Sequence, residues 1–494
     1  MKKLFSEIVE GIQLKENLIQ LKTLIKDEEK KAECKTLIEG KETLFLSFLE
    51  HEEPKVRRAA AKVLGEMQLQ EALEPIFHVY LKEETLFVKK DYLTAIAELN
   101  YESLLPALKD RYEELLKEQV EETKQVHVAE EMQQIQKMIV AFEGIKKHRF
   151  TGIKRSCEVL LTTKKALKDV TLNALSCPKK PVPAGVMAKV STEDVFRNVR
   201  TFEEALVRVM PGQQYPNRPE EIGEMLGKSQ LVSFLEECHE GEAPFYFRIQ
   251  VEGMMSVEQR SSFTKKLARK LEQVTEGKLI NSTSGYELEI RLLQGKDDMW
   301  NAFVKLYTMP DYRFAYRKEH VSASIKPYLA ANLMELAKPY LDPEAQVLDP
   351  FCGVGTMLIE RRMVMNTADA YGLDIFGEAI EKARVNSKEV GPNIHYINRD
   401  FADFKHDYKF DEIVTNMPTK SKNLSHKDVD GLYNLLFKRG EQLLAKGGIM
   451  VVYGNEKSTM KKCLRIFRRY KLLREFEIDY KTENWLFVIQ YCGE

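Results

Sequence analysis

The sequence lacks several features that would assign it to a class at once. Seven cysteines are scattered over 494 residues, and no two have the CxxC spacing of a zinc site. The odd, scattered set also disfavours a disulfide framework and fits a reducing compartment. No apolar run approaches the roughly 20 residues of a membrane helix. Acidic residues interrupt the N-terminal stretch where a secretory signal needs an apolar run, so we expect a cytoplasmic protein, with no membrane contact and no metal.

The chain also carries almost no net charge. Lys and Arg total 75, Asp and Glu total 76, and the formal net charge is −1. Overall charge therefore neither indicates nor excludes a nucleic-acid partner, and only local clusters are informative. The composition is that of an ordinary globular protein. Its length predicts several domains, because single cores stop growing at roughly 250–300 residues.

Residues 1–145 have helical apolar spacing and an internal repeat. Val56–Met67 (VRRAAAKVLGEM) aligns with Val88–Leu99 (VKKDYLTAIAEL), and each is followed by a segment with a proline, ALEPIF or SLLPAL. Two-helix units at this period are typical of α-solenoids. The region resembles HEAT repeats, which implies a surface for a protein partner. An irregular helical bundle is the alternative, since only two units are clear.

Residues 146–190 are strongly basic within a neutral chain. We expect a basic helical segment and a linker, with a domain boundary at Pro178, Pro181, Pro183 and Gly185. A local positive field suits phosphate, and a solvated helix face explains the same residues equally well. The residues expected to contact RNA in this segment are Lys146, Lys147, Arg149, Lys154 and Arg155.

Residues 191–310 have the pattern of an α+β module. Phe245–Gly253 and Gly285–Leu293 are strand-like, and Ser261–Val274 is an amphipathic helix with Ser261 as the expected cap. The helix has a basic face that includes Lys266 and Arg269. This face suits either RNA binding or packing of the module with its lysines in water.

Strand and helix patterns alternate over residues 311–494, which predicts a doubly wound α/β sheet with helices on both faces. The motif DPFCGVGT (Asp349–Thr356) follows the first of these strands. Gly353 and Gly355 allow a nucleotide-like ligand to lie against the main chain. Leu358 stands where a dinucleotide fingerprint needs its third glycine, which weakens a pyrophosphate interpretation.

Three further strand ends complete the pattern. YGLD places Asp374 where a carboxylate accepts hydrogen bonds from two ribose hydroxyls. NRDF places Asp400 where it can bond an adenine amino group, and FDEIVTNMP ends with Asn416 and Pro418. All four sites lie at the carboxyl edge of the predicted sheet, where open α/β sheets bind ligands.

These motifs, in this order and spacing, resemble the class I S-adenosylmethionine-dependent methyltransferases. The upstream stretch Tyr312–Ala337 is similar to the corresponding region of THUMP-type RNA (guanine-N2) methyltransferases. The resemblance implies a THUMP-like RNA-binding module over 191–310, a Rossmann-like methyltransferase domain over 311–494, and Asn416 and Pro418 as the methyl-acceptor motif. It implies S-adenosyl-L-methionine as cofactor, held by Asp349, Phe351, Cys352, Gly353, Gly355, Thr356, Asp374, Ile375, Asp400, Phe401, Asn416 and Ser324.

The sequence departs from this family directly after Pro418. Relatives carry an aromatic residue there, often followed by glycine, where this chain has Thr419 and Lys420. A missing ring removes a stacking platform worth roughly 1–3 kcal/mol. Three explanations are open: another ring stacks instead, the acceptor is not a purine amine, or the domain binds the cofactor without methylating. The candidate replacement rings are Phe351, Phe401 and Tyr433.

The sequence therefore predicts a multidomain RNA methyltransferase. Its expected acceptor is a base nitrogen of tRNA or rRNA, with the guanine exocyclic amine as the first choice. One alternative is a catalytically degenerate cofactor-binding scaffold that recruits proteins through its helical repeats. A second alternative is a methyltransferase that acts on protein.

Overall fold

The computed structural model describes residues 1–117, 121, 124–144, 148–208, 210–391, 393–422 and 424–493. These residues form two compact units. Unit 1 combines Met1–His148, Tyr215–Val232 and Glu242–Glu287, and unit 2 combines Arg149–Gln214, Ser233–Gly241 and Leu288–Glu494. In these described ranges, no helix has both the length and the apolar character needed to cross a membrane.

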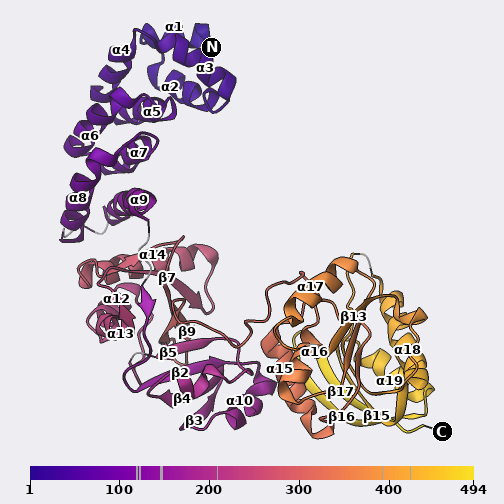
Figure 1. Cartoon of the computed structure of the whole chain (residues 1–494). Helices are drawn as coiled ribbons and strands as arrows, with labels where there is room; N and C mark the ends of the chain where they lie inside the picture. The colour runs from indigo at the N-terminus through magenta and orange to yellow at the C-terminus, as the bar shows by residue number, and fades with distance from the viewer. Residues whose placement is uncertain are drawn as a thin grey trace. The chain divides into compact units, whose positions relative to one another are not determined.

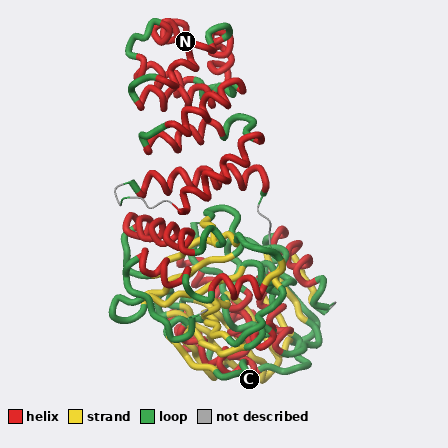
Figure 2. Tube along the Cα trace, turned by 90° about the vertical axis from the view of Figure 1, so that its left-hand side faces the viewer, coloured by secondary structure: helices red, strands yellow, loops and turns green. Residues whose placement is uncertain are grey.

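Helices and turns make up the described part of residues 1–144 in unit 1 (Figures 1 and 2). The α-helices are α1 (Lys2–Val9), α2 (Leu14–Leu24), α3 (Glu28–Ile38), α4 (Glu42–Ser47), α5 (Pro54–Glu66), α6 (Leu73–Lys82), α7 (Leu86–Ile96), α8 (Leu105–Lys117) and α9 (Gln125–Glu143). The repeat in the sequence corresponds to the helix pairs α5–α6 and α7–α8.

Equivalent helices of the two repeats pack closely. A Cβ atom on Gly65 of α5 would lie 2.7 Å from the Cα atom of Ala95 on α7, so only glycine fits at this crossing. Asp91 on α7 also forms ion pairs with Arg58 and Lys62 of α5. The stacked two-helix units expected from the sequence are therefore present.

The rest of unit 1 contains α12 (Pro219–Gly227), α14 (Val257–Val274), β7 (Phe245–Glu252) and β8 (Leu279–Asn281). The expected cap of α14 at Ser261 is wrong. The helix starts with a capping box in which the Gln259 N–H donates to Ser256 Oγ and the Ser256 N–H donates to the Gln259 side chain. This reciprocal pair satisfies two free donors at once, which favours Ser256 over Ser261.

Unit 2 begins with a β-rich part. Its strands follow the order β3-β4-β2-β5-β10-β9, and their bounds are β2 (Cys157–Thr162), β3 (Lys179–Val182), β4 (Gly185–Val190), β5 (Ala205–Arg208), β9 (Leu288–Gln294) and β10 (Trp300–Leu306). β1 (Arg149–Phe150) and β6 (His239–Glu240) form a separate antiparallel pair. The short helices here are α10 (Lys168–Ala174) and α11 (Asp194–Arg197), and α13 (Leu231–Cys238) runs from unit 1 into unit 2.

Residues 149–190 differ from the basic helical segment and linker that the sequence predicts. They contain four strands and only one α-helix, α10. In β2 the buried run Val159–Leu161 supplies the core of the sheet, while the lysines lie mostly outside it. Pro181 lies on edge strand β3 and Pro183 in the turn to β4. Proline is tolerated at such positions because no ladder donor of a central strand is lost.

The C-terminal part of unit 2 is a seven-stranded sheet with the order β13-β12-β11-β14-β15-β17-β16 (Figure 1). The first five strands of this order are parallel, and β17 is antiparallel to both of its neighbours. The strand bounds are β11 (Val347–Asp349), β12 (Ala370–Asp374), β13 (Ile394–Asn398), β14 (Phe410–Asn416), β15 (Leu444–Gly454), β16 (Tyr470–Asp479) and β17 (Asn484–Tyr491).

Helices cover both faces of this sheet. They are α15 (Pro327–Ala337), α16 (Thr356–Val364), α17 (Gly377–Ser387), α18 (His426–Leu443) and α19 (Lys457–Ile466). Val347 and Val414 belong to the core with α15–α17, whereas their neighbours Leu348 and Ile413 belong to the core with α18 and α19. Because side chains alternate across a strand, the sheet is buried on both faces, as the doubly wound prediction requires.

Candidate active site

The turn after β11 contains a buried carboxylate with one unpartnered oxygen. The Thr415 hydroxyl (2.7 Å) and the Phe351 N–H (3.1 Å) both donate to Asp349 Oδ1, whereas Asp349 Oδ2 is buried without a partner. Burial raises the pKa of Asp349 to about 7. An unmet buried acceptor costs free energy, so this oxygen marks a place for a ligand that donates a hydrogen bond.

The two glycines of the turn have different surroundings. Gly355 has a φ of +83°, and a Cβ there would lie 2.2 Å from the hydroxyl oxygen of Tyr396. Gly353 has a φ of +52°, and its Cβ position has open space around it. Both backbone conformations favour glycine. Gly355 is thus required for packing within the protein, while Gly353 leaves room in which a ligand can approach the main chain.

Asp374 lies beside this open space at the end of β12. Its Oδ2 accepts a hydrogen bond from the Gly353 N–H and its Oδ1 accepts one from the Phe376 N–H, both at 2.9 Å. Each carboxylate oxygen has a second lone pair, so both can still accept ligand hydroxyls. Sheet register pairs Asp349 with Gly372 and Asp374 with Asn398, which brings the strand ends to one edge.

The predicted adenine contacts divide into exposed and buried residues. Asp400 is exposed, and its Oδ1 accepts a hydrogen bond from the Ala402 N–H at 2.8 Å. Phe401 is 2% exposed and packs edge-on against Phe351 at 5.8 Å between ring centroids. Phe401 therefore supports the site from the core and offers no free ring face.

Two apolar side chains next to Asp374 are exposed instead. Ile375 is 61% exposed and Phe376 is 68% exposed. Exposed large apolar side chains beside a polar ligand site are typical of a surface that a ligand covers. Ile375 was predicted from the sequence and Phe376 was not, although the apolar pair directly after YGLD was the available signal.

Cys352 and Thr356 are turned into the protein. Burial holds the pKa of the Cys352 thiol well above its usual range, so it is no nucleophile, and its N–H donates to Leu373 O at 2.8 Å. Thr356 is 2% exposed, and its hydroxyl oxygen is buried without a partner at the start of α16. Both residues shape the turn through their burial.

The segment before α15 is attached to the glycine turn by Asn386. The Asn386 side-chain nitrogen donates to Glu319 O (3.0 Å) and Val354 O (3.1 Å), and its oxygen accepts from the Glu319 N–H (2.9 Å). Ser324 Oγ accepts from the Val321 N–H at 3.0 Å and closes the turn of this segment. Asn386 was missed by sequence reasoning because a single asparagine within a helix carries no motif.

Asn416 ends β14 at the same edge as the glycine turn. Its neighbour Thr415 donates to Asp349, and Asn416 pairs with Tyr453 in the parallel ladder. Asn416 is half-buried, and no hydrogen bond joins its side chain to another described residue. The next strand supplies a feature that the sequence did not reveal. Asn455, just beyond β15, has an Oδ1 atom that is buried without a partner.

The expected aromatic platform is absent at its usual place. Pro418 is half-buried, and Thr419 and Lys420 are exposed. Of the three candidate replacement rings, Tyr433 and Phe401 are only 1% and 2% exposed. Phe351 is the member of this set that is half-buried, so it alone of the three reaches the surface.

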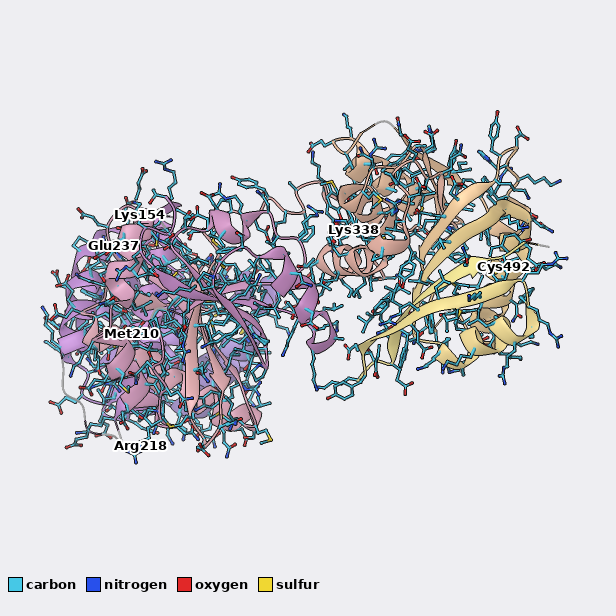
Figure 3. All side chains as sticks on the ribbon, turned by 90° about the horizontal axis from the view of Figure 1, so that it is seen from below. Lys154, Met210, Arg218, Glu237, Lys338 and Cys492 are labelled. Carbon is cyan, nitrogen blue, oxygen red and sulfur yellow. The ribbon has the colours of Figure 1, made fainter. Side chains whose placement is uncertain are left out.

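The residues predicted to bind RNA in unit 2 are largely neutralised by carboxylates. Arg149 forms an ion pair with Glu240, and Arg155 forms one with Glu237 at 2.8 Å. Lys154 is exposed, and both Lys154 and Glu237 reach the surface (Figure 3). Lys146 and Lys147 lie outside the described residues. In unit 1, Lys266 lies 3.6 Å from Glu220, and Arg269 is only 8% exposed.

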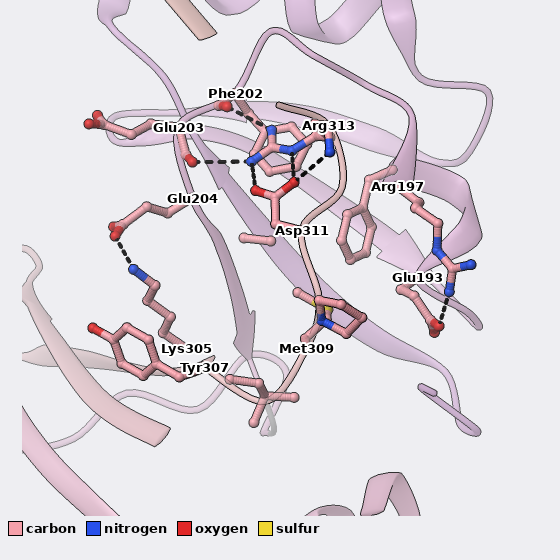
Figure 4. A pocket seen from close by; sticks show the side chains of 14 residues that line it. Glu193, Arg197, Phe202, Glu203, Glu204, Lys305, Tyr307, Met309, Asp311 and Arg313 are labelled. Carbon is pink, nitrogen blue, oxygen red and sulfur yellow. Dashed lines mark hydrogen bonds and ion pairs between the residues drawn. The ribbon is translucent and has the colours of Figure 1, made fainter. Parts of the chain in front are cut away.

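A cavity of about 260 Å³ in unit 2 is lined by none of the glycine-turn residues. The Arg313 guanidinium carbon lies 3.6 Å from the centroid of the Phe202 ring, and the guanidinium pairs with Asp311 at 2.7 Å (Figure 4). The neighbouring Lys305 is paired with Glu204 at 2.6 Å. The charged side chains that line this cavity are thus paired with other protein groups. Within the described ranges, no three His, Cys, Asp or Glu residues gather as a metal site.

Known proteins match two parts of this chain. Residues 315–483 match the family model of the RMKL-like methyltransferase domain, and residues 42–122 match HEAT repeats. A tRNA (guanine(10)-N2)-dimethyltransferase from Methanothermobacter thermautotrophicus is 30% identical over 129 residues, which cover 26% of this chain and 37% of that protein. Protein MG259 from Mycoplasma genitalium is 28% identical over 33% of this chain and 37% of its own. The chain thus spans 37% of the length of these curated relatives.

Solved structures share the fold over a longer stretch. TrmN from Thermus thermophilus aligns with a TM-score of 0.51 at 17% identity, over 68% of this chain and 99% of its own. SMU.472, solved in complex with SAH, aligns with a TM-score of 0.52 at 18% identity, over 69% and 99%. The C-terminal α/β domain is therefore of the methyltransferase type, with S-adenosylmethionine as its cofactor. The helices over residues 42–122 are of the HEAT-repeat type.

Proposed function

We propose that the C-terminal domain methylates the exocyclic amine of a guanine in RNA, with tRNA or rRNA as substrate. The observation that carries the proposal is the 2.7 Å hydrogen bond from Thr415 to Asp349, because it joins the acceptor strand to the glycine turn. The similarity to a tRNA (guanine(10)-N2)-dimethyltransferase supports guanine as the acceptor base.

The residues at the sheet edge fit the cofactor in charge and space. The unpartnered Asp349 Oδ2 would accept from the ammonium of the methionine end, which relieves the cost of its burial. Open space at Gly353 admits the ligand to the main chain, and Asp374 has free lone pairs for the ribose hydroxyls. Phe376 and Ile375 would cover the adenine, whose amino group Asp400 would accept.

Asn416 would orient the acceptor amine. This amine is a weak nucleophile because its lone pair is delocalised into the ring, whereas S-adenosylmethionine supplies a methyl group on a positively charged sulfur. Asn416 Oδ1 would accept one amine hydrogen and Asn455 Oδ1 the other, which directs the nitrogen lone pair at the methyl carbon. When bound, the cofactor would supply this methyl group to the amine nitrogen that Asn416 and Asn455 hold, and the amine would lose one proton to water. Such positioning supplies several kcal/mol of a barrier.

The other parts of the chain would present the RNA. In this proposal the α+β module over residues 191–310 is THUMP-like and, with the exposed Lys154, contacts the phosphate backbone. The HEAT repeats provide a further surface for RNA or for a protein partner. A cytoplasmic location agrees with this role and stays a prediction.

The test is methylation of total RNA from a strain that lacks the gene, with tritiated S-adenosylmethionine and purified full-length protein. We expect label in one RNA class and a loss of at least 100-fold in Asn416→Ala, with cofactor affinity retained within threefold. Asn434→Ala, the same change in the middle of α18, is the matched control and should retain activity. Folded, cofactor-binding protein that labels no RNA would contradict the proposal.

A degenerate cofactor-binding scaffold is the second candidate function. It is favoured by the exposed Thr419 and Lys420 and by the burial of Tyr433 and Phe401, which leaves Phe351 as the available ring. Phe351→Leu separates the two functions. If Phe351 stacks on the base, Phe351→Leu should reduce labelling and Thr419→Tyr should change it little. If the protein is a scaffold, the parent and both variants should be inactive with every substrate. Label in a polypeptide would instead indicate protein methylation.

A further inference from the structure

A second cavity, of about 440 Å³, lies entirely within unit 1. One wall comes from α9 and the other from α14, with additional contributions from α7, α8 and the end of β8. Its volume lies in the range of sites that hold cofactor-sized ligands. It contains none of the residues assigned to methyl transfer.

Two buried polar side chains line the cavity and have unmet hydrogen-bonding atoms. Tyr112 and Gln136 are each 7% exposed, and Tyr112 Oη and Gln136 Nε2 are buried without a partner. Buried polar groups in proteins are nearly always satisfied, and each exception calls for a bonding partner. A hydroxyl and an amide that face one cavity together therefore point to a polar ligand.

Glu272 lines the same cavity and adds an acceptor. It is 8% exposed, and its Oε1 accepts from the Asn281 N–H at 2.7 Å. Burial raises the pKa of Glu272 to about 7, so near neutral pH it can either accept or donate a hydrogen bond. The buried groups thus combine donors and acceptors, which matches the edge of a nucleobase.

The walls and the rim of the cavity differ in character. Ala129 and Met132 of α9 and Ala268 of α14 are small or flexible apolar residues, which suits contact with the flat faces of a ring. Lys265 of α14 is exposed and forms no ion pair with a described residue. An unpaired ammonium group at the exposed rim suits a phosphate.

We propose that this cavity binds a nucleotide, with the base against Gln136, Tyr112 and Glu272 and the phosphate at Lys265. The site is independent of the proposed methyl transfer, because it shares no residue with the sheet edge. A free nucleotide and an unpaired nucleotide of an RNA strand present the same chemistry to it. The experiment below separates these two sources.

The test is calorimetric titration of the full-length protein at low salt with AMP, GMP, CMP, UMP and inorganic phosphate. A parallel titration uses a ten-nucleotide single-stranded RNA of mixed sequence. All titrations are made with saturating S-adenosylhomocysteine, so that nucleotide binding at the methyltransferase site does not contribute. We expect one site per chain for at least one nucleotide, and weaker binding of phosphate alone.

Three variants in the cavity and two controls outside it define the site. Gln136→Leu should weaken the binding about tenfold or more, because it removes the amide and keeps the volume. Tyr112→Phe should weaken it about fivefold, and Lys265→Ala should weaken it and reduce its salt dependence. Gln134→Leu on α9 does not alter a lining residue and should bind as the parent protein does. Lys270→Ala, whose ammonium lies 3.7 Å from Glu224, is the matched control for Lys265.

Each outcome decides the proposal. Mononucleotide binding that depends on Gln136 and Lys265 supports a free ligand, and the same dependence seen only with the oligonucleotide supports an RNA strand. Absence of binding by any probe would overturn the proposal, as would binding that the three cavity variants leave unchanged. Phosphate that binds as tightly as the nucleotides would also overturn it, because the base would then contribute nothing. Thermal unfolding shows that each variant is folded.

Discussion

Asp349 and Glu272 are two buried carboxyl groups in different units of the molecule. The sequence predicted a ligand site at Asp349 and none at Glu272. Burial raises the pKa of each to about 7. Asp349 stands in a run of eight motif residues that, together with the strand ends downstream, predicts a ligand. Glu272 meets Tyr112 and Gln136, which are far away in the chain and come from other helices. A ligand site on one turn can thus be recognised from sequence, whereas a site between helices becomes visible only in the structure.

The largest test of this comparison is a pair of glycine substitutions. Gly355→Ala would place a Cβ 2.2 Å from the Tyr396 hydroxyl at a φ of +83°, so we expect cofactor affinity to fall at least 100-fold and thermal stability to drop. Gly353→Ala meets open space in the protein, so its stability should fall by only about 1 kcal/mol. Its cofactor affinity should still fall, because the methyl group enters the ligand's space. Calorimetry and thermal unfolding measure both.

The cavity of unit 1 supplies the control for these glycine variants. Gly353→Ala should leave nucleotide binding in this cavity unchanged. Gly355→Ala should weaken it only if the substitution also unfolds unit 1. Equal stability losses in the two glycine variants would show that Gly353 is packed and has no space for a ligand.

The pH dependence of stability tests the two carboxyls directly. In the folded protein each carboxyl keeps its proton up to about pH 7, whereas in the unfolded chain it releases the proton near its ordinary pKa, 3.8 for Asp349 and 4.5 for Glu272. The folded state binds more protons in this window, so these groups lower the free energy of unfolding as pH rises from about 4 to 7. The contribution then stays constant at higher pH. Its upper limit is roughly 4.5 kcal/mol for Asp349 and roughly 3.5 kcal/mol for Glu272, at about 1.4 kcal/mol per pKa unit.

Urea unfolding at pH 5 and pH 8 measures this effect by difference. The parent protein should lose free energy of unfolding between pH 5 and pH 8. Asp349→Asn and Glu272→Gln should each remove one part of this loss. Saturating S-adenosylhomocysteine should remove the Asp349 part alone, because its ammonium would stabilise the ionised carboxylate. If neither variant alters the change in the free energy of unfolding with pH, these carboxyls do not titrate in this range.

The sequence predicted most of the C-terminal domain because its signals are local. Strand ends, glycines and carboxylates follow one another at fixed spacing, and the structure brings Asp349, Asp374 and Asn416 to one sheet edge. Prediction failed where local composition and tertiary context disagree. Lysines and prolines over 149–190 suggested a helix and a linker, yet the buried Val159–Leu161 pairs in a sheet. Asn386 and Asn455 carried no signal, since their roles depend on which strands become neighbours.

A smaller effect is expected from the exposed ring beside Asp374. Phe376 is 68% exposed, so Phe376→Ala should leave stability within about 0.5 kcal/mol. Cofactor affinity should fall about five- to twentyfold, because the ring would lose its contact with the adenine. Phe401→Ala is the contrast, since removal of this buried ring should cost about 3–5 kcal/mol of stability. Fluorescence titration and urea unfolding separate the two. Unchanged affinity in Phe376→Ala would remove this residue from the site.

The smallest expected effect concerns which of the two units contacts RNA phosphates. Lys154 in unit 2 is exposed, and removal of one such contact should weaken binding of RNA about two- to threefold at 150 mM salt. The salt slope should fall by about one, without a change in sequence preference. Arg149→Ala is the matched control, because its guanidinium already pairs with Glu240. Filter binding at several salt concentrations measures both variants. If Lys265→Ala lowers the slope and Lys154→Ala does not, the cavity in unit 1 is the part of the chain that meets the phosphate backbone.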